Sequence, residues 1–152
     1  MPLDGERKSI PVVRTPADEL AGQLSPDGRW IAYNSNRTGA YQVYAERFPP
    51  SAGDRECIQL SSGLGHGARW RLDGRELYYF DAGQFMAVPV QTGKTLQLGA
   101  PRPLFDISRI YHSSYGYYPA PDGRRFLFSA AIEDEFAHDS AATVAVNRFA
   151  SF

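Results

Sequence analysis

The sequence has few of the features that mark a membrane, secreted or nucleic-acid-binding protein. It contains one cysteine, Cys57, so no disulfide can form within the chain, and an inert thiol is favoured over a nucleophile. The formal net charge is -1, which gives no basic excess for nucleic acid or an anionic membrane. Residues 1–8 are mostly polar, and no apolar run is long enough to span a bilayer. These absences predict a cytoplasmic protein that binds neither nucleic acid nor membrane.

Signatures of catalysis and of metal binding are also missing. No Gly-x-Ser-x-Gly nucleophile elbow occurs, and neither the His-Arg-Asp nor the Asp-Phe-Gly motif of kinases is present. The histidines His66, His112 and His138 lie far apart and lack the spacing of metal ligands. The acidic segment 133–135 matches no calcium-binding loop. We therefore predict no catalytic residue, no metal site and no cofactor.

The residues that are abundant favour strands joined by turns. There are nine Tyr, nine Phe, 14 Gly and 11 Pro. An Asp-Gly-Arg turn followed by an apolar run occurs three times, and its aspartates lie 46 and then 49 residues apart. The turn residues are Asp27 with Gly28, Asp73 with Gly74, and Asp122 with Gly123. This period is typical of one four-stranded propeller blade of roughly 40–50 residues.

The chemistry of this motif predicts a hairpin in each repeat. Asp can accept a hydrogen bond from the backbone two residues on, and Gly adopts positive φ. Asp-Gly between apolar runs is a strong hairpin signal, so each motif should join a blade's innermost strand to its second strand. An arginine follows each turn, at Arg29, Arg75 and Arg124. This recurrence favours a structural role, such as reaching a carbonyl or carboxylate of a neighbouring blade, over a binding patch.

The apolar pattern predicts an all-β domain over residues 1–152. The expected strands are 9–14, 22–24, 30–35, 42–47, 56–60, 68–71, 76–80, 85–90, 103–105, 115–119, 126–129 and 143–149. An orphan outer strand at 9–14 precedes antiparallel blades at 18–62, 63–108 and 111–150, the last lacking its outer strand. No segment has a helical stripe, and 130–136 is interpreted as part of a loop.

Several segments resemble the Pro-Asp repeat of TolB-like propellers. These are 23–33, 41–49, 68–78, 85–90 and 143–147, and the resemblance covers nearly the whole chain. The last three resemble the C-terminal part of a subgroup in which the propeller follows a bacterial serine/threonine kinase domain, a DNA-binding domain or a transport-related domain. The chain departs from the pattern at Leu72, where the other repeats have Pro. It also lacks TolB's export signal and N-terminal domain, so TolB's lipoprotein partnership is not carried over.

Three blades cannot close a ring, because closed propellers have about four to eight blades. Two apolar blade faces would be left in water. A twofold homodimer would give six blades, with strand 9–14 completing the partner's third blade. The residues of this strand exchange would be Ile10, Val12 and Val13 from one copy, with Val144 and Val146 from the other. The alternative is that the chain is a fragment of a longer propeller.

The function that these observations favour is non-catalytic binding of a protein or peptide, or scaffolding. Loops that lead into the innermost strands would line one mouth of the channel, where Tyr and His side chains can stack on and hydrogen-bond a ligand. The candidate residues are Glu19, His66, Arg69, Tyr115 and Tyr117. In the alternative interpretation, the tyrosines pack between blades. A hydrolase or lyase on a propeller scaffold, or a non-functional remnant of a kinase-linked propeller, are the other candidates.

Overall fold

The computed structural model describes residues 12–13, 15–50, 56–107, 117–131 and 140–145. All regular elements in these residues are β-strands, and every strand pair is antiparallel. The predicted all-β class is therefore confirmed. In these same residues, no helix is long and apolar enough to cross a membrane.

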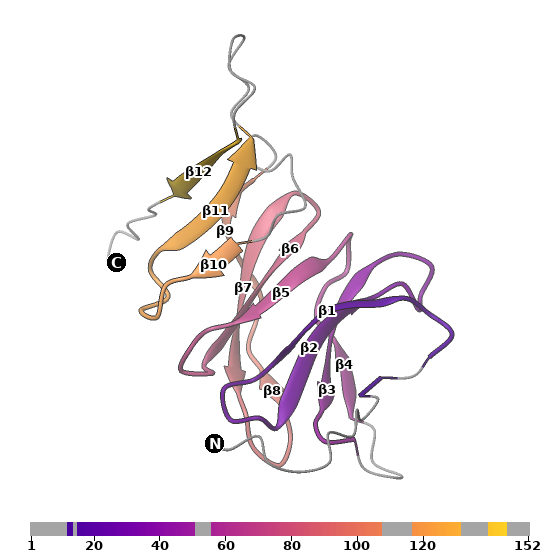
Figure 1. The fold of residues 1–152 in the computed structure, drawn as a ribbon. Coiled ribbons are helices and arrows are strands. Elements are labelled where there is room, and N and C mark those ends of the chain that lie inside the picture. The colour runs from indigo at the N-terminus through magenta and orange to yellow at the C-terminus, as the bar shows by residue number, and fades with distance from the viewer. Residues whose placement is uncertain (1–11, 14, 51–55, 108–116, 132–139, 146–152) are drawn as a thin grey trace, which may run out of the picture.

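The strands form three sheets, each of which follows the order of the chain (Figure 1). Sheet 1 contains β1 (Glu19–Leu24), β2 (Trp30–Ser35), β3 (Gln42–Arg47) and β4 (Cys57–Gln59). Sheet 2 contains β5 (His66–Trp70), β6 (Glu76–Asp81), β7 (Gln84–Gln91), β8 (Gln97–Leu98) and β9 (Arg102–Asp106). Sheet 3 contains β10 (Tyr117–Pro119), β11 (Phe126–Ala131) and β12 (Ser140–Ala145).

The fourth strand of sheet 2 is interrupted. Both β8 and β9 pair with β7, and residues 99–101 separate them. The Gly99 amide donates to the Pro89 carbonyl at 2.8 Å, and Pro101 has no amide hydrogen to offer. The sequence pattern predicted only the second half of this strand, because β8 has two residues and no apolar run.

Other predicted bounds differ at their ends. Strands β2 and β3 have the predicted bounds, whereas Ala130 and Ala131 extend β11 into the segment interpreted as a loop. In the predicted orphan strand, the structure describes only Val12 and Val13, which lie outside the strands. Ile10 and Val146 lie outside the described residues.

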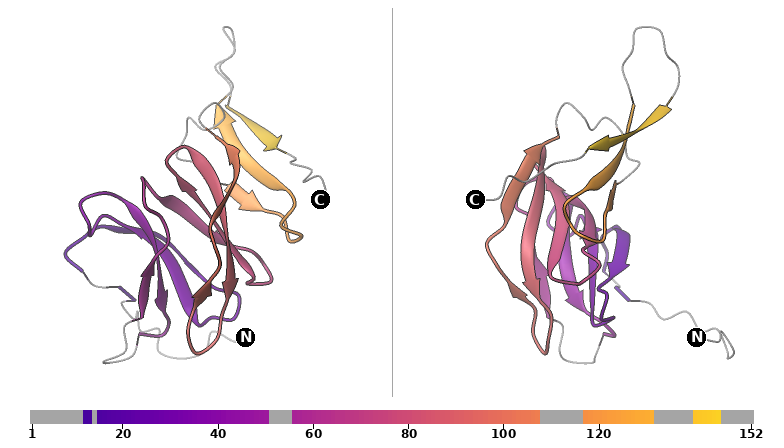
Figure 2. Two further views of the ribbon diagram at one scale, coloured as in Figure 1. Left: turned by 180° about the vertical axis from the view of Figure 1, so that it is seen from behind. Right: turned by 90° about the vertical axis from the view of Figure 1, so that its left-hand side faces the viewer.

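Strand β6 is buried on both faces, and this places sheet 2 between the other two sheets (Figure 2). Successive side chains of a strand point to opposite faces. Leu77 and Tyr79 pack in a cluster with sheet 1, whereas Tyr78 and Phe80 pack in a cluster with sheet 3. Each cluster therefore joins two sheets through alternate residues of the same strand.

The contact between sheets 1 and 2 combines apolar packing with hydrogen bonds. Trp30 is fully buried in the first cluster. The Trp70 amide donates to Gln23 Oε1 at 2.9 Å, and the Trp70 indole donates to the Gln23 carbonyl at 3.1 Å. The Tyr79 hydroxyl donates to the Leu60 carbonyl at 3.1 Å. These bonds fix the position of one sheet relative to the other.

Aromatic rings hold sheet 3 against sheet 2. The Phe85 ring meets the rings of Tyr117 and Phe126 edge to face, with centroids 4.8 and 4.9 Å apart. Such pairs each contribute about 0.5–1.5 kcal/mol beyond the burial of their area. Sheet 3 is therefore attached mainly through rings.

The three Asp-Gly turns have the same hydrogen bonds. Gly28, Gly74 and Gly123 have φ of 68°, 73° and 65°. The backbone amides of Arg29, Arg75 and Arg124 donate to the aspartate Oδ1 two residues earlier, at 3.1, 3.0 and 2.9 Å. These are the contacts that the Asp-Gly sequence favours.

A carboxylate network at the sheet 2–sheet 3 contact surrounds Glu76. Its Oε2 accepts hydrogen bonds from Arg71 at 3.1 Å and from the Tyr78 hydroxyl at 2.8 Å, and its Oε1 accepts from Arg102 at 3.0 Å. The third turn packs on this network, since a Cβ at Gly123 would lie 2.7 Å from the Tyr78 hydroxyl. The network therefore supports the turn of sheet 3.

The first strands of sheets 1 and 2 contain an irregularity at the same place in the repeat. The register shifts between Leu20 and Gln23 in β1 and between His66 and Arg69 in β5. Ala21 and Gly67, each six residues before a turn aspartate, have φ of 54° and 69°. Ala21 thus adopts a left-handed conformation that glycine adopts without strain.

We expect Ala21→Gly to stabilise the protein. The left-handed conformation costs roughly 1–2 kcal/mol for a residue with a Cβ, and the flexibility of glycine in the unfolded chain offsets part of the gain. The net increase in the free energy of unfolding should be about 0.5–1 kcal/mol. Urea denaturation followed by tryptophan fluorescence measures it. The matched reverse change, Gly67→Ala, should destabilise, because its Cβ would lie 3.0 Å from the Phe80 ring.

We expect the contribution of Glu76 to stability to be lost in acid. Burial alone would raise the pKa of Glu76, but hydrogen bonds from Tyr78, Arg102 and Arg71 hold it below the ordinary value of 4.5. A carboxyl group with a lowered pKa stabilises the fold above its unfolded pKa, and this stability disappears as the pH falls through the folded pKa. The difference in urea midpoint between wild type and Glu76→Gln should therefore be larger at pH 7 than at pH 3. A difference that is independent of pH would contradict this.

Candidate functional site

Three of the residues predicted to line a channel mouth lie at one end of the molecule, where the first strand of each sheet begins. Glu19, His66 and Tyr117 are the first residues of β1, β5 and β10. Strand β5 contacts both β1 and β10, so these three residues lie at the same end of neighbouring strands (Figure 1). Tyr115 lies outside the described residues.

Glu19 and His66 are half-buried and held by local contacts. Glu19 Oε1 accepts a hydrogen bond from the Thr15 hydroxyl, and the Thr15 hydroxyl oxygen accepts one from the Ala17 amide at 3.1 Å. The His66 ring packs on the Phe80 ring, with centroids 5.1 Å apart. Both side chains are thus positioned at the rim of this end.

Tyr117 belongs to the core. It is 1% exposed, and its ring meets Phe80 edge to face at 5.0 Å and stacks on Phe128 at 5.7 Å. Tyr117 therefore packs between sheets, as in the alternative in which the tyrosines have a packing role. Arg69 is half-buried and donates to the Ala68 carbonyl at 2.9 Å.

Several acidic residues, together with Arg37, stand at the end of the molecule that carries Glu19. Asp18 and Glu19 stand at the start of β1, Asp81 ends β6, and Asp106 ends β9 opposite Gln84. Asp81 accepts hydrogen bonds from the Ser62 and Gly63 amides at 3.0 and 2.8 Å. Within the described residues, no three His, Cys, Asp or Glu side chains gather closely enough to hold a metal ion.

A polar cluster, which we call the Tyr33 cluster, lies on the face of sheet 1 turned away from sheet 2. It consists of Tyr33, Arg37, Glu46 and Cys57. The Tyr33 hydroxyl donates to Glu46 Oε2 at 2.9 Å and accepts a hydrogen bond from Arg37. Arg37 also donates to Cys57 Sγ at 3.3 Å. Burial, followed by the hydrogen bond to Glu46, raises the pKa of Tyr33 well above its ordinary value.

The Tyr33 cluster was not predicted from the sequence. No sequence pattern required a charged group beside Cys57, and the structure places the Arg37 guanidinium there. The register that sets Cys57 opposite Glu46 also brings these groups together. That register depends on how β3 pairs with a three-residue strand, for which the sequence carries no pattern.

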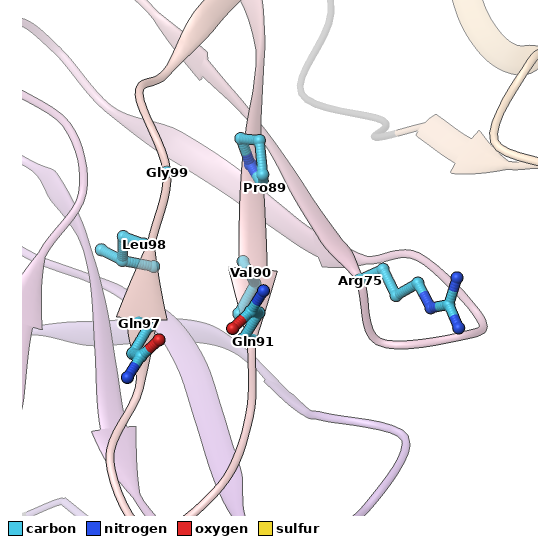
Figure 3. Close-up of a pocket in the computed structure, with 7 residues that line it drawn as sticks. All are labelled: Arg75, Pro89, Val90, Gln91, Gln97, Leu98 and Gly99. Atoms are coloured by element: carbon cyan, nitrogen blue, oxygen red, sulfur yellow. The ribbon is translucent and has the colours of Figure 1, made fainter.

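A groove of about 610 Å³ lies along the outer strands of sheet 2 (Figure 3). Arg75, Pro89, Val90, Gln91, Gln97, Leu98 and Gly99 line it. Gln91 and Gln97 stand opposite each other on β7 and β8. The groove therefore combines two exposed carboxamides with an apolar floor, and Arg75 lies at its margin with its side chain extending away from the strands (Figure 3).

The arginines that follow the turns do not have the expected structural contacts. Arg29, Arg75 and Arg124 are exposed. Among the residues that the structure describes, their side chains form no hydrogen bond and no ion pair. The expectation that they reach a carbonyl or carboxylate of a neighbouring sheet is wrong for this part of the chain.

Comparison with known proteins assigns no family to this arrangement. No protein-family model matches the chain, and no curated protein matches it significantly.

We expect Tyr33→Phe to destabilise the protein by roughly 1–3 kcal/mol, because a buried carboxyl group loses its hydroxyl donor. Tyr44→Phe is the matched control, since among the described residues its hydroxyl bonds to the neutral side chains of Thr38 and Gln59, both at 3.4 Å. The free energy of unfolding in urea should fall clearly for the first variant and little for the second. Equal losses would contradict a special role of the Tyr33 hydroxyl.

Proposed function

We propose that the three sheets are three blades of a TolB-like propeller, and that a second copy completes a six-bladed ring. The ring would act as a non-catalytic module that binds a protein or peptide. The observation that carries this proposal is the position of sheet 2, which packs against another sheet on both faces, whereas sheets 1 and 3 each pack against a sheet on one face among the described residues. In a stack of repeats, the outer face of each terminal repeat needs a further packed layer like the one that covers the inner repeats.

The uncovered faces carry exposed apolar side chains. Leu24, which stands opposite Ile31 in sheet 1, is 45% exposed. Tyr118 and Leu127, which stand opposite each other in sheet 3, are 68% and 41% exposed. Contact between these faces would remove this apolar surface from water, which is favourable by about 25 cal/mol per Å².

The repeat supports a pairing of sheet 3 with sheet 1 of a second copy. Leu127 lies 49 residues after Tyr78 and so occupies the same position of the repeat, and Tyr78 packs against sheet 3. Ile31 lies 46 residues before Leu77 and so occupies the same position as Leu77, which packs against sheet 1. Each uncovered face thus has an apolar residue at the position used for packing inside the stack. A twofold axis would form this contact twice and close the ring.

The Tyr33 cluster favours the binding of one specific partner to the face of sheet 1 that is turned away from sheet 2. Glu46 pairs with Ile31, and Val88 pairs with Leu77, so Glu46 occupies the position of an apolar residue in the next sheet. Glu46 is 4% exposed and bonded to Tyr33. A buried polar group that must keep its partners favours one docking geometry over a general apolar contact.

We also propose that strand 9–14 of the second copy pairs with the outer edge of β12. Strand β12 pairs with β11, and none of the strands in the described ranges pairs with its other edge. Ile10, Val12 and Val13 would then lie beside Val144 and Val146. Addition of a strand to a free edge satisfies backbone groups that would otherwise be left to water.

The closure of the ring predicts a dimer that Leu127→Glu disrupts. Size-exclusion chromatography with light scattering should give twice the mass of one chain for wild type and a smaller species for the variant, because a carboxylate would enter an apolar contact. Leu72→Glu is the control, since Leu72 is 67% exposed in a turn away from the two uncovered faces. A stable monomeric wild type would overturn the proposal of a closed ring.

A further inference from the structure

Three exposed guanidinium groups occupy the same position in the repeat. Arg29, Arg75 and Arg124 each follow an Asp-Gly pair. Within the described part of the chain their side chains form no hydrogen bond and no ion pair, although the charges of Arg29 and Arg124 act on the carboxylates of Asp27 and Asp122. The turn aspartates accept hydrogen bonds from the backbone amides of these arginines. The carboxylates are therefore engaged within the turns, whereas the guanidinium groups are left for another molecule.

The three turns are neighbours in space. A Cβ at Gly74 would lie 3.6 Å from Pro26 of the first turn, and a Cβ at Gly123 would lie 2.9 Å from Nε of Arg71, where the second turn begins. Figure 1 shows the turns after β1, β5 and β10 following one another along one side of the molecule. We call this side the turn end. The arginines thus form a row along it.

The charges of the two ends differ. Arg71 and Arg125 lie beside the row at the turn end, each paired with an aspartate of its own turn. The opposite end carries Asp18, Glu19, Asp81 and Asp106 at the ends of its strands. The carboxylates of Asp27, Asp73, Asp122 and Glu76 stand at the same end as the row, so the attraction for anions is confined to the exposed guanidinium groups of the row.

The groove of sheet 2 begins beside the central arginine of the row. Arg75 lines it, and the Arg75 carbonyl accepts a hydrogen bond from the Val90 amide at 2.8 Å. Among described residues, the side chains of Gln91 and Gln97 form no hydrogen bond, so both carboxamides can bind the main chain of a peptide. Figure 3 shows both carboxamides at one end of the groove.

We infer that the turn end binds an acidic segment of a partner protein. Carboxylates of the segment would contact Arg29, Arg75 and Arg124, and a neighbouring part of its main chain would lie in the groove. Guanidinium groups suit this task because they bind carboxylates with two parallel hydrogen bonds. This inference rests on the proposed binding function, but it requires neither the closed ring nor the predicted mouth at the opposite end.

The experiment measures fluorescence anisotropy of a short, labelled oligoglutamate peptide titrated with the full chain. Wild type should bind, and affinity should fall as salt rises. The triple variant Arg29→Gln/Arg75→Gln/Arg124→Gln should weaken binding by about tenfold or more, since each exposed charge pair contributes a modest factor. Arg75→Gln alone should weaken binding several-fold, whereas Lys94→Gln, which removes one exposed charge outside the row, should have little effect.

Three outcomes would overturn the inference. The first is equal affinity of wild type and the triple variant, and the second is an equal loss for Lys94→Gln and Arg75→Gln. The third is that oligoglutamate does not bind and that the protein instead self-associates in a salt-sensitive way that the triple variant abolishes. The arginine row would then bind the opposite end of a second copy. A monomeric wild type that still binds through the row would refute the closed ring alone, and a dimer without such binding would refute this inference alone.

Discussion

Strand β6 has no face suited to water, and the rest of the structure depends on this constraint. Leu77, Tyr78, Tyr79 and Phe80 are each at most 1% exposed, although successive side chains point to opposite sides of the strand. A strand of this kind is stable only with a packed layer on each side. Sheets 1 and 3 supply these layers, and the arrangement of the turns, the groove and the two uncovered faces follows from their positions.

Local chemistry explains why much of the fold was predictable. Trp30–Ser35 and Gln42–Arg47 are apolar runs bounded by turn residues, so their bounds are encoded in a few neighbouring residues. The Asp-Gly pairs determine their own turn geometry through a side chain and one positive φ. Where such local signals are weak, as at Gln97–Leu98, the strand exists only because β7 offers it an edge.

The candidate sites were less predictable, because they depend on contacts between distant segments. The Tyr33 cluster joins residues from β2, the following turn, β3 and β4, and only the pairing of β3 with β4 brings Cys57 opposite Glu46. The recurrence of Arg29, Arg75 and Arg124 was visible in the sequence. The role of these arginines was not predictable, because a repeated residue can contribute either to the fold or to ligand binding. Whether its side chain is buried or exposed in the structure distinguishes these two roles.

The break in the outer strand of sheet 2 affects how the molecule can meet other chains. Between β8 and β9, the pairing with β7 is interrupted after the hydrogen bond from Gly99 to Pro89, and Pro101 and Pro103 have no amide hydrogen to donate. A long, regular edge invites pairing with any extended polypeptide, which is a route to fibrous aggregates. The kinked margin of sheet 2 offers an approaching strand no continuous row of donors and acceptors, so the protein is protected there against uncontrolled polymerisation.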